Sequence, residues 1–200
     1  HSIGRAAVVA VTAALALTAC TGDDKATFDQ GGAPQQSTQA AAGGDAEGDT
    51  AAESAAAAGV DLTAVGKPIA TATVPAVVEG DPDATMTVSI YSLKRDGKTL
   101  TGTFSFIVNS DSASDEANSL YEYLGGTPWE PYLVDTANLA RHDVLGDFPH
   151  EALTEQIKTS FRPEQTFFAY AAFAAPAADI TSMTVSLVDG APPATNLAIQ

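Results

Sequence analysis

The side chains of this chain that could act as acids, bases or nucleophiles are few, and their spacing is poor for catalysis. In its second half, His142 stands beside Asp143 and His150 stands beside Glu151. Adjacent residues of an extended strand point to opposite faces, so neither pair can work as one unit through sequence proximity. The His-Glu-x-x-His, Gly-x-Ser-x-Gly and phosphate-loop motifs are missing from the sequence. We therefore expect no enzyme and no cofactor, and a triad assembled from distant residues is the alternative.

Carboxylates gather in two turn-rich stretches that could hold a metal ion. Asp81 and Asp83 lie in the first stretch, and Asp111 and Asp115 lie in the second. Calcium takes roughly six to eight oxygen ligands from groups of this kind. Neither stretch has the glycine and carboxylate spacing of an EF-hand. Charged, solvated turns are the main interpretation, and a calcium site is the alternative.

Aromatic side chains cluster at Tyr121, Tyr123, Trp129 and Tyr132. Tyrosine and tryptophan combine apolar area with a polar tip, so an exposed cluster would suit recognition of a protein, a glycan or another ligand. Burial at a sheet edge is the more usual arrangement for such residues. These four residues are our candidate recognition site, with burial as the alternative.

Cys20 is the single cysteine, and it follows an apolar run from Ala6 to Leu17. At about 1.5 Å per residue this run would span roughly 18 Å as a helix, well short of the ~30 Å core of a bilayer. With Arg5 before it, the run has the pattern of a secretory signal segment. One cysteine cannot form an internal disulfide, but its thiolate is a good nucleophile for accepting a lipid.

The residues Leu17-Thr18-Ala19-Cys20 resemble the lipobox of bacterial lipoproteins. That resemblance implies cleavage before Cys20 and attachment of a diacylglycerol to its sulfur. Two or more acyl chains give stable anchoring, whereas one gives marginal binding. We therefore expect residues 1–20 to be a signal peptide and the protein to be held on the outer face of the cytoplasmic membrane. A free or buried cysteine is the alternative.

Residues 21–59 are rich in alanine, glycine and acidic residues, and they contain one large apolar side chain, Phe28. Such a composition buries too little surface to offset the entropy of ordering, so it predicts a disordered linker. The helix-prone stretch Ala51–Ala58 is too short to persist alone. An acidic metal-binding tract is the sharper alternative.

The chain carries 25 acidic against 9 basic residues, a net charge of −16, and every acidic residue follows Cys20. An acidic surface of this kind repels phosphate backbones, so we expect no nucleic-acid partner. It also repels anionic lipid headgroups, so membrane attachment should depend on the lipid on Cys20.

From about Val60 onward, short apolar runs alternate with turns, which is typical of β-strands. The clearest hairpin joins Thr85–Leu93 to Leu100–Val108 through an Asp-Gly turn, and Pro75 restricts the preceding strand to an edge or a bend. Several short strands at this spacing predict an all-β antiparallel β-sandwich over residues 60–200. We expect the core to contain the following residues: Ile90, Phe104, Phe106, Val108, Phe168, Tyr170, Val185 and Leu187, with Trp129 as a plug between the sheets.

The span from about Leu100 to Ile199 resembles the immunoglobulin-like accessory domain of some actinobacterial secreted lipoproteins. The segments that carry this resemblance are Phe104–Asn109, Tyr132–Asp135, Thr166–Tyr170, Phe173–Pro176 and Asn196–Ile199. It implies an immunoglobulin-like sandwich. We expect a non-enzymatic binding or accessory module of the cell envelope with a protein partner, and a solute- or calcium-binding lipoprotein is the alternative.

Overall fold

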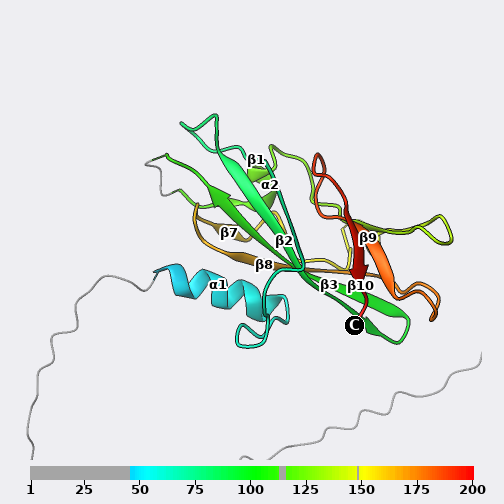
Figure 1. The fold of residues 1–200 in the computed structure, drawn as a ribbon. Coiled ribbons are helices and arrows are strands. Elements are labelled where there is room, and N and C mark those ends of the chain that lie inside the picture. Colours follow the sequence, from blue (N-terminus) through cyan, green and yellow to red (C-terminus); the bar gives the residue numbers. More distant parts are fainter. Residues whose placement is uncertain (1–45, 113–115, 148) are drawn as a thin grey trace, which may run out of the picture. The chain divides into compact units, whose positions relative to one another are not determined.

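The computed structural model describes residues 46–112, 116–147 and 149–200, which form mostly β-strands in antiparallel sheets (Figure 1). The elements in chain order are α1 (Ala46–Ala57), β1 (Ala70–Pro75), β2 (Thr85–Asp96), β3 (Thr99–Asn109), β4 (Asn118–Ser119), α2 (Leu120–Tyr123), β5 (Tyr132–Asp135), β6 (Ala140–His142), β7 (Ser160–Phe161), β8 (Phe167–Ala174), β9 (Ser182–Ser186) and β10 (Ala194–Ala198). The expected all-β class is confirmed, in that antiparallel sheets dominate and helices are few.

The first sheet has the order β1-β2-β3-β8, with every neighbouring pair antiparallel. The expected hairpin forms its centre, because alternating apolar residues place Met86, Val88 and Ile90 on one buried face. The hairpin turn is shorter than expected. Gly97 has φ +56 and sits at the first position of a two-residue turn, where a positive φ matches the twist of the flanking strands. Strand β2 therefore runs through to Asp96.

The second sheet has the order β10-β9-β5-β6, and β4 and β7 form a separate short pair. Strand β5 pairs with β9 on one side and with β6 on the other, both antiparallel. The turn between β5 and β6 is closed by Asp135, whose carboxylate accepts hydrogen bonds from Ala137 N–H and from Asn138. These bonds hold the pKa of Asp135 below its usual range, with the Asn138 side chain as the largest cause.

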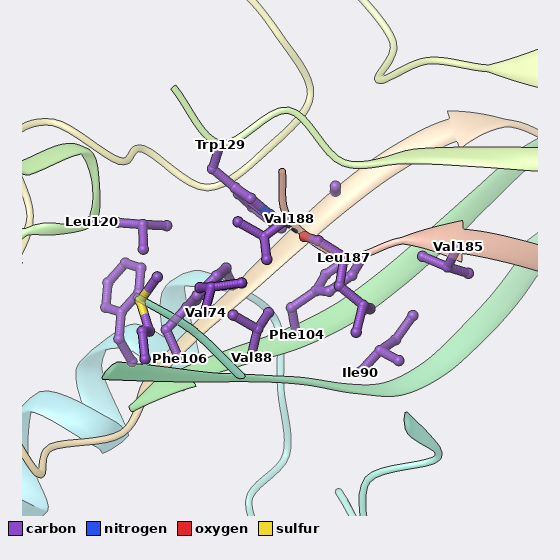
Figure 2. Close-up of a cluster of buried hydrophobic side chains, with 14 of the residues drawn as sticks. Val74, Val88, Ile90, Phe104, Phe106, Leu120, Trp129, Val185, Leu187 and Val188 are labelled. Carbon is purple, nitrogen blue, oxygen red and sulfur yellow. Dashed lines mark hydrogen bonds between the residues drawn. The ribbon is translucent and has the colours of Figure 1, made fainter. Parts of the chain in front are cut away.

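Side chains from both sheets meet in one hydrophobic core (Figure 2). Trp129 is 1% exposed and lies between them, as the sequence predicts. Its ring makes edge contacts with Phe104 and Phe106, both at 5.1 Å between centroids. Its Nε1–H donates to the Leu187 carbonyl at 2.8 Å, so its polar atom is satisfied in the core.

Strand β8 is buried on both faces, and here the predicted core is partly wrong. Phe167, Ala169, Ala171 and Phe173 face the shared core, whereas Phe168 belongs to the opposite face and packs against Tyr91. The predicted core residue Tyr170 lies on that opposite face too, and it is half-buried. Apolar residues at consecutive positions give no alternation from which to choose a face.

Helix α1 lies beside β8, inside the range that the sequence predicts to be a disordered linker (Figure 1). Ser54 and Ala55 are 4% and 1% exposed, and the Phe168 N–H donates to Ser54 Oγ at 3.1 Å. Tertiary contact with β8 thus stabilises a helix whose own sequence is too short to persist. Residues 46–57 are a correction to the expected linker, and residues 21–45 lie outside the described part of the chain.

Candidate functional site

The four aromatic candidates do not form an exposed recognition cluster. Trp129 and Tyr123 are buried, and the Tyr123 hydroxyl donates to the Phe161 carbonyl at 2.8 Å. Burial raises the pKa of Tyr123 above its usual value. Tyr132 is half-buried beneath the Arg141 guanidinium, which lies 3.9 Å from the ring centroid. Packing in the core therefore accounts for Trp129 and Tyr123. Because these two side chains are buried, they cannot form an exposed recognition surface together with the half-buried Tyr121.

Of the acidic candidates, Asp81 stabilises a loop through its carboxylate. Asp81 accepts hydrogen bonds from Ser110 Oγ at 2.6 Å and from Asp111 N–H at 2.8 Å. These bonds, with the Ser110 hydroxyl first, lower the pKa of Asp81. Asp83 and Asp111 are exposed, and Asp115 lies outside the described residues. Within residues 46–112, 116–147 and 149–200, no three His, Cys, Asp or Glu side chains are grouped to hold a metal ion.

The neighbouring side chains of His142 and Asp143 have different hydrogen-bond partners. His142 Nδ1 lies 2.8 Å from the Ala174 carbonyl, whereas Asp143 accepts a hydrogen bond from Arg141. His150 is exposed, and its backbone N–H donates to the Asp147 carbonyl at 2.7 Å. The His142 side chain thus binds the end of β8.

Cys20 and the rest of the predicted signal peptide lie outside the described residues. In the part of the chain that the structure does describe, no helix has both the length and the apolar character needed to cross a bilayer.

The outer edge of β8 is closed by hydrogen bonds from two other segments. Besides the Phe168 N–H bound by Ser54, the Tyr170 N–H donates to Thr154 Oγ1 at 2.8 Å. The Ala172 N–H donates to the Ala152 carbonyl at 2.8 Å. Two carbonyls on this edge are bound as well, because Tyr170 O accepts from Thr154 N–H and Ala172 O accepts from Leu145 N–H.

The edge of β1 on the other side of the same sheet is open. In the described part of the chain, no hydrogen bond joins the outward N–H and C=O groups of Thr71 or Thr73 to another segment. The open stretch ends at Pro75, which has no N–H, and beyond it the Val77 N–H donates to the Tyr123 carbonyl at 2.9 Å. The sequence predicted an edge or a bend from Pro75, and the sheet order places β1 at an edge.

A groove of about 540 Å³ lies between β1 and β10. Its walls come from residues 69–73 and from residues 192–195, with Leu187 and Leu197 also contributing. None of the lining residues is charged. In a chain of net charge −16 this is an unusual surface, and we call it the β1–β10 groove. The groove was not predicted from the sequence, and the available signal is that stretches 68–78 and 190–200, which supply most of its lining, carry no charged residue.

A second hollow of about 460 Å³ lies between residues 59–69 and the outer face of β2 and β3. Lys67 and Lys94 line it together with Asp61 and several hydroxyl groups. The Asp61 carboxylate accepts from Thr63 Oγ1 at 2.6 Å and from Thr63 N–H at 2.9 Å, so it is engaged in its own turn.

Comparison with known proteins returned no matching family model, curated protein or solved structure.

Proposed function

We propose that this chain is a lipid-anchored lipoprotein of the bacterial cell envelope whose β domain is a non-enzymatic module that binds another protein. The single observation that carries the binding role is the uncharged β1–β10 groove on a strongly acidic chain. Interfaces between proteins are depleted of charged residues at their centre, and the lining of this groove has that property.

The order of the strands supports an immunoglobulin-like arrangement of this module. The order β10-β9-β5-β6 matches the G-F-C-C′ sheet of such domains, and β2-β3-β8 matches A-B-E. Residues 144–154 run along the outer edge of β8, where strand D would lie. Trp129, just before β5, takes the place of the tryptophan on strand C and packs on Phe104 and Phe106 of β3. The extra strand β1 is a departure from that pattern.

Anchoring through Cys20 is tested by replacing it with serine in the full chain. We expect Cys20→Ser to abolish incorporation of labelled palmitate and to release the protein from the membrane fraction. The matched control is Thr21→Ser, which changes the neighbouring residue and should leave both readouts intact. Membrane retention of Cys20→Ser would contradict the lipoprotein proposal.

Binding of a protein partner is tested by photo-crosslinking in intact cells. A photoreactive residue at the exposed position Thr195, on the groove wall, should give a discrete protein adduct by mass spectrometry. The same residue at exposed Thr136, in the turn after β5, is the control and should give none. Identical adduct patterns from both positions would contradict a partner at the groove.

Binding of a small solute is the second candidate, and the hollow beside Lys67 and Lys94 favours it. A lining with two lysine ammonium groups and several hydroxyl groups suits an anion better than calcium. Calorimetry with calcium and with small carboxylates tests this candidate. Heat with neither ligand would remove it.

A further inference from the structure

We propose that the partner binds as an added β-strand along β1, through an extended segment without charged side chains. This inference rests on the proposed function and specifies how it is carried out. Addition of a strand to an exposed sheet edge gives affinity through main-chain hydrogen bonds, and pockets for alternate side chains give specificity.

The register of β1 defines which groups the added strand would meet. Ala70 pairs with Ile90, Ala72 with Val88 and Val74 with Met86, and the same register continues to the hydrogen bond from Ala76 N–H to Ala84 O at 2.9 Å. Hydrogen-bonded pairs alternate along an antiparallel ladder. The even-numbered residues therefore bind β2, and the N–H and C=O groups of Thr71 and Thr73 point outward.

The length of the site is set at both ends. Toward the C-terminal end, Pro75 lacks an N–H and the Val77 N–H is already bound by Tyr123 O. Toward the N-terminal end, the Ile69 N–H turns inward and donates to the Ile90 carbonyl at 2.8 Å. The open stretch is therefore Ala70–Val74, long enough for a short pairing with a few main-chain hydrogen bonds.

The groove defines the chemistry of the occupant. A strand along β1 would lie in the β1–β10 groove, with alternate side chains toward Leu187 and Leu197. No lining residue offers a charge to pair with, so a charged side chain there would be desolvated without compensation. A second copy of this chain is disfavoured, because it would bring another charge of −16 to a contact of only a few residues.

The test uses the full chain in detergent and a fluorescent peptide of alternating valine and threonine, blocked at both ends. Fluorescence anisotropy should detect binding of this peptide. The same peptide N-methylated at every amide keeps its side chains but cannot donate hydrogen bonds, and it should not bind. Amide exchange measured by NMR should slow at Thr71 and Thr73 when the unmodified peptide is added. Equal binding of both peptides would overturn strand addition.

Two variants of the chain make the test specific to the edge. Thr73→Pro removes an outward N–H and should weaken peptide binding about tenfold or more. Thr73→Val keeps the backbone and nearly the same shape, so it should bind the peptide as the parent chain does. Melting curves that match the parent would show that both variants are folded.

The remaining outcomes separate this inference from the proposed function. If the photoreactive residue at position 195 crosslinks a protein in cells but Thr73→Pro does not reduce that adduct, strand addition is overturned. The proposed function as a protein-binding module is then retained. If light scattering finds a dimer that Thr73→Pro dissociates, the occupant is a second copy and the inference is also overturned. If the peptide binds at β1 but no protein is crosslinked in cells, the proposed function fails while the edge retains its strand-binding property.

Discussion

The two edges of the first sheet differ in whether other segments bind their outward backbone groups. On β8, three successive outward amides are bound by Ser54, Thr154 and Ala152, which come from two separate segments of the chain. On β1, the outward groups of Thr71 and Thr73 have no such cover in the described residues. Exposed edges invite pairing with other chains, so proteins usually protect them. A chain that covers one edge this thoroughly and leaves the other open has a surface suited to pairing with a partner.

The second sheet shows protection by other means. Strand β10 has a register shift between Ala194 and Leu197, where Asn196 has φ +58, and two prolines precede it. Bulges and prolines both interrupt edge pairing. Strand β6 has only three residues, and its exposed Arg141 adds a charge. Among the edges of the two four-stranded sheets that the structure describes, β1 is thus the one along which Ala70–Val74 has no covering segment, bulge, proline or charged side chain.

The largest effect should separate two neighbouring residues of β1. Ala72→Pro removes an amide that faces β2 and should lower the free energy of unfolding by about 2–3 kcal/mol. Thr73→Pro removes an amide that faces outward, and its cost should stay below about 1 kcal/mol. Urea denaturation of both variants measures the contrast. Equal costs would mean that the outward edge of β1 is not open.

Loss of the cover on β8 should have an intermediate effect. Thr154→Val replaces the hydroxyl that accepts from Tyr170 N–H, and Thr154 is 8% exposed. A buried amide left without an acceptor costs about 1–3 kcal/mol, so the unfolding midpoint in urea should fall accordingly. Thr154→Ser keeps the hydroxyl and is the control, with a smaller loss. A Val variant as stable as Ser would show that the cover on β8 contributes nothing.

A substitution in helix α1 should weaken the cover on β8 at Phe168, the other end of the same edge. Ser54→Ala should cost about 1 kcal/mol, because the Phe168 amide loses its acceptor. The effect should be local, with faster hydrogen exchange at Phe168 and little change at Ala172. Glu53→Gln alters an exposed position of the same helix and should leave both amides as they were. Uniform acceleration along β8 would show that α1 supports the whole sheet instead of this one site.

Local patterning predicts the hairpin, because a hairpin depends on alternation and turn residues within a short stretch. It cannot predict the docking of α1, since an alanine-rich helix with no apolar stripe becomes ordered only through contact with β8. It also cannot choose the core face of β8, where both faces are apolar. Pro75 restricted β1 to an edge or a bend, and β1 lies at an edge. The groove remained hidden because its two walls, residues 69–73 and 192–195, lie far apart in sequence.

The smallest effect concerns pH, and it should distinguish the two edges. Ser119 N–H and Oγ both donate to Glu122 Oε2 at 2.8 Å, and these bonds lower the pKa of Glu122, the backbone bond most. This capping box supports α2, whose Tyr123 carbonyl binds Val77 N–H at the end of the open edge. A carboxyl whose pKa is lower in the folded state stabilises the fold above its unfolded pKa of about 4.3, and that stabilisation is lost as pH falls through the folded pKa.

Acidification below about pH 4.3 should therefore speed hydrogen exchange at Val77 relative to its intrinsic rate. The amides of Phe168, Tyr170 and Ala172 should keep their protection, because their acceptors are hydroxyl and carbonyl oxygens that do not titrate. Glu122→Gln removes the titrating group and should flatten the pH dependence at Val77. If protection falls in parallel at Val77 and on β8, the two edges open together, and the contrast between them does not extend to their dynamics.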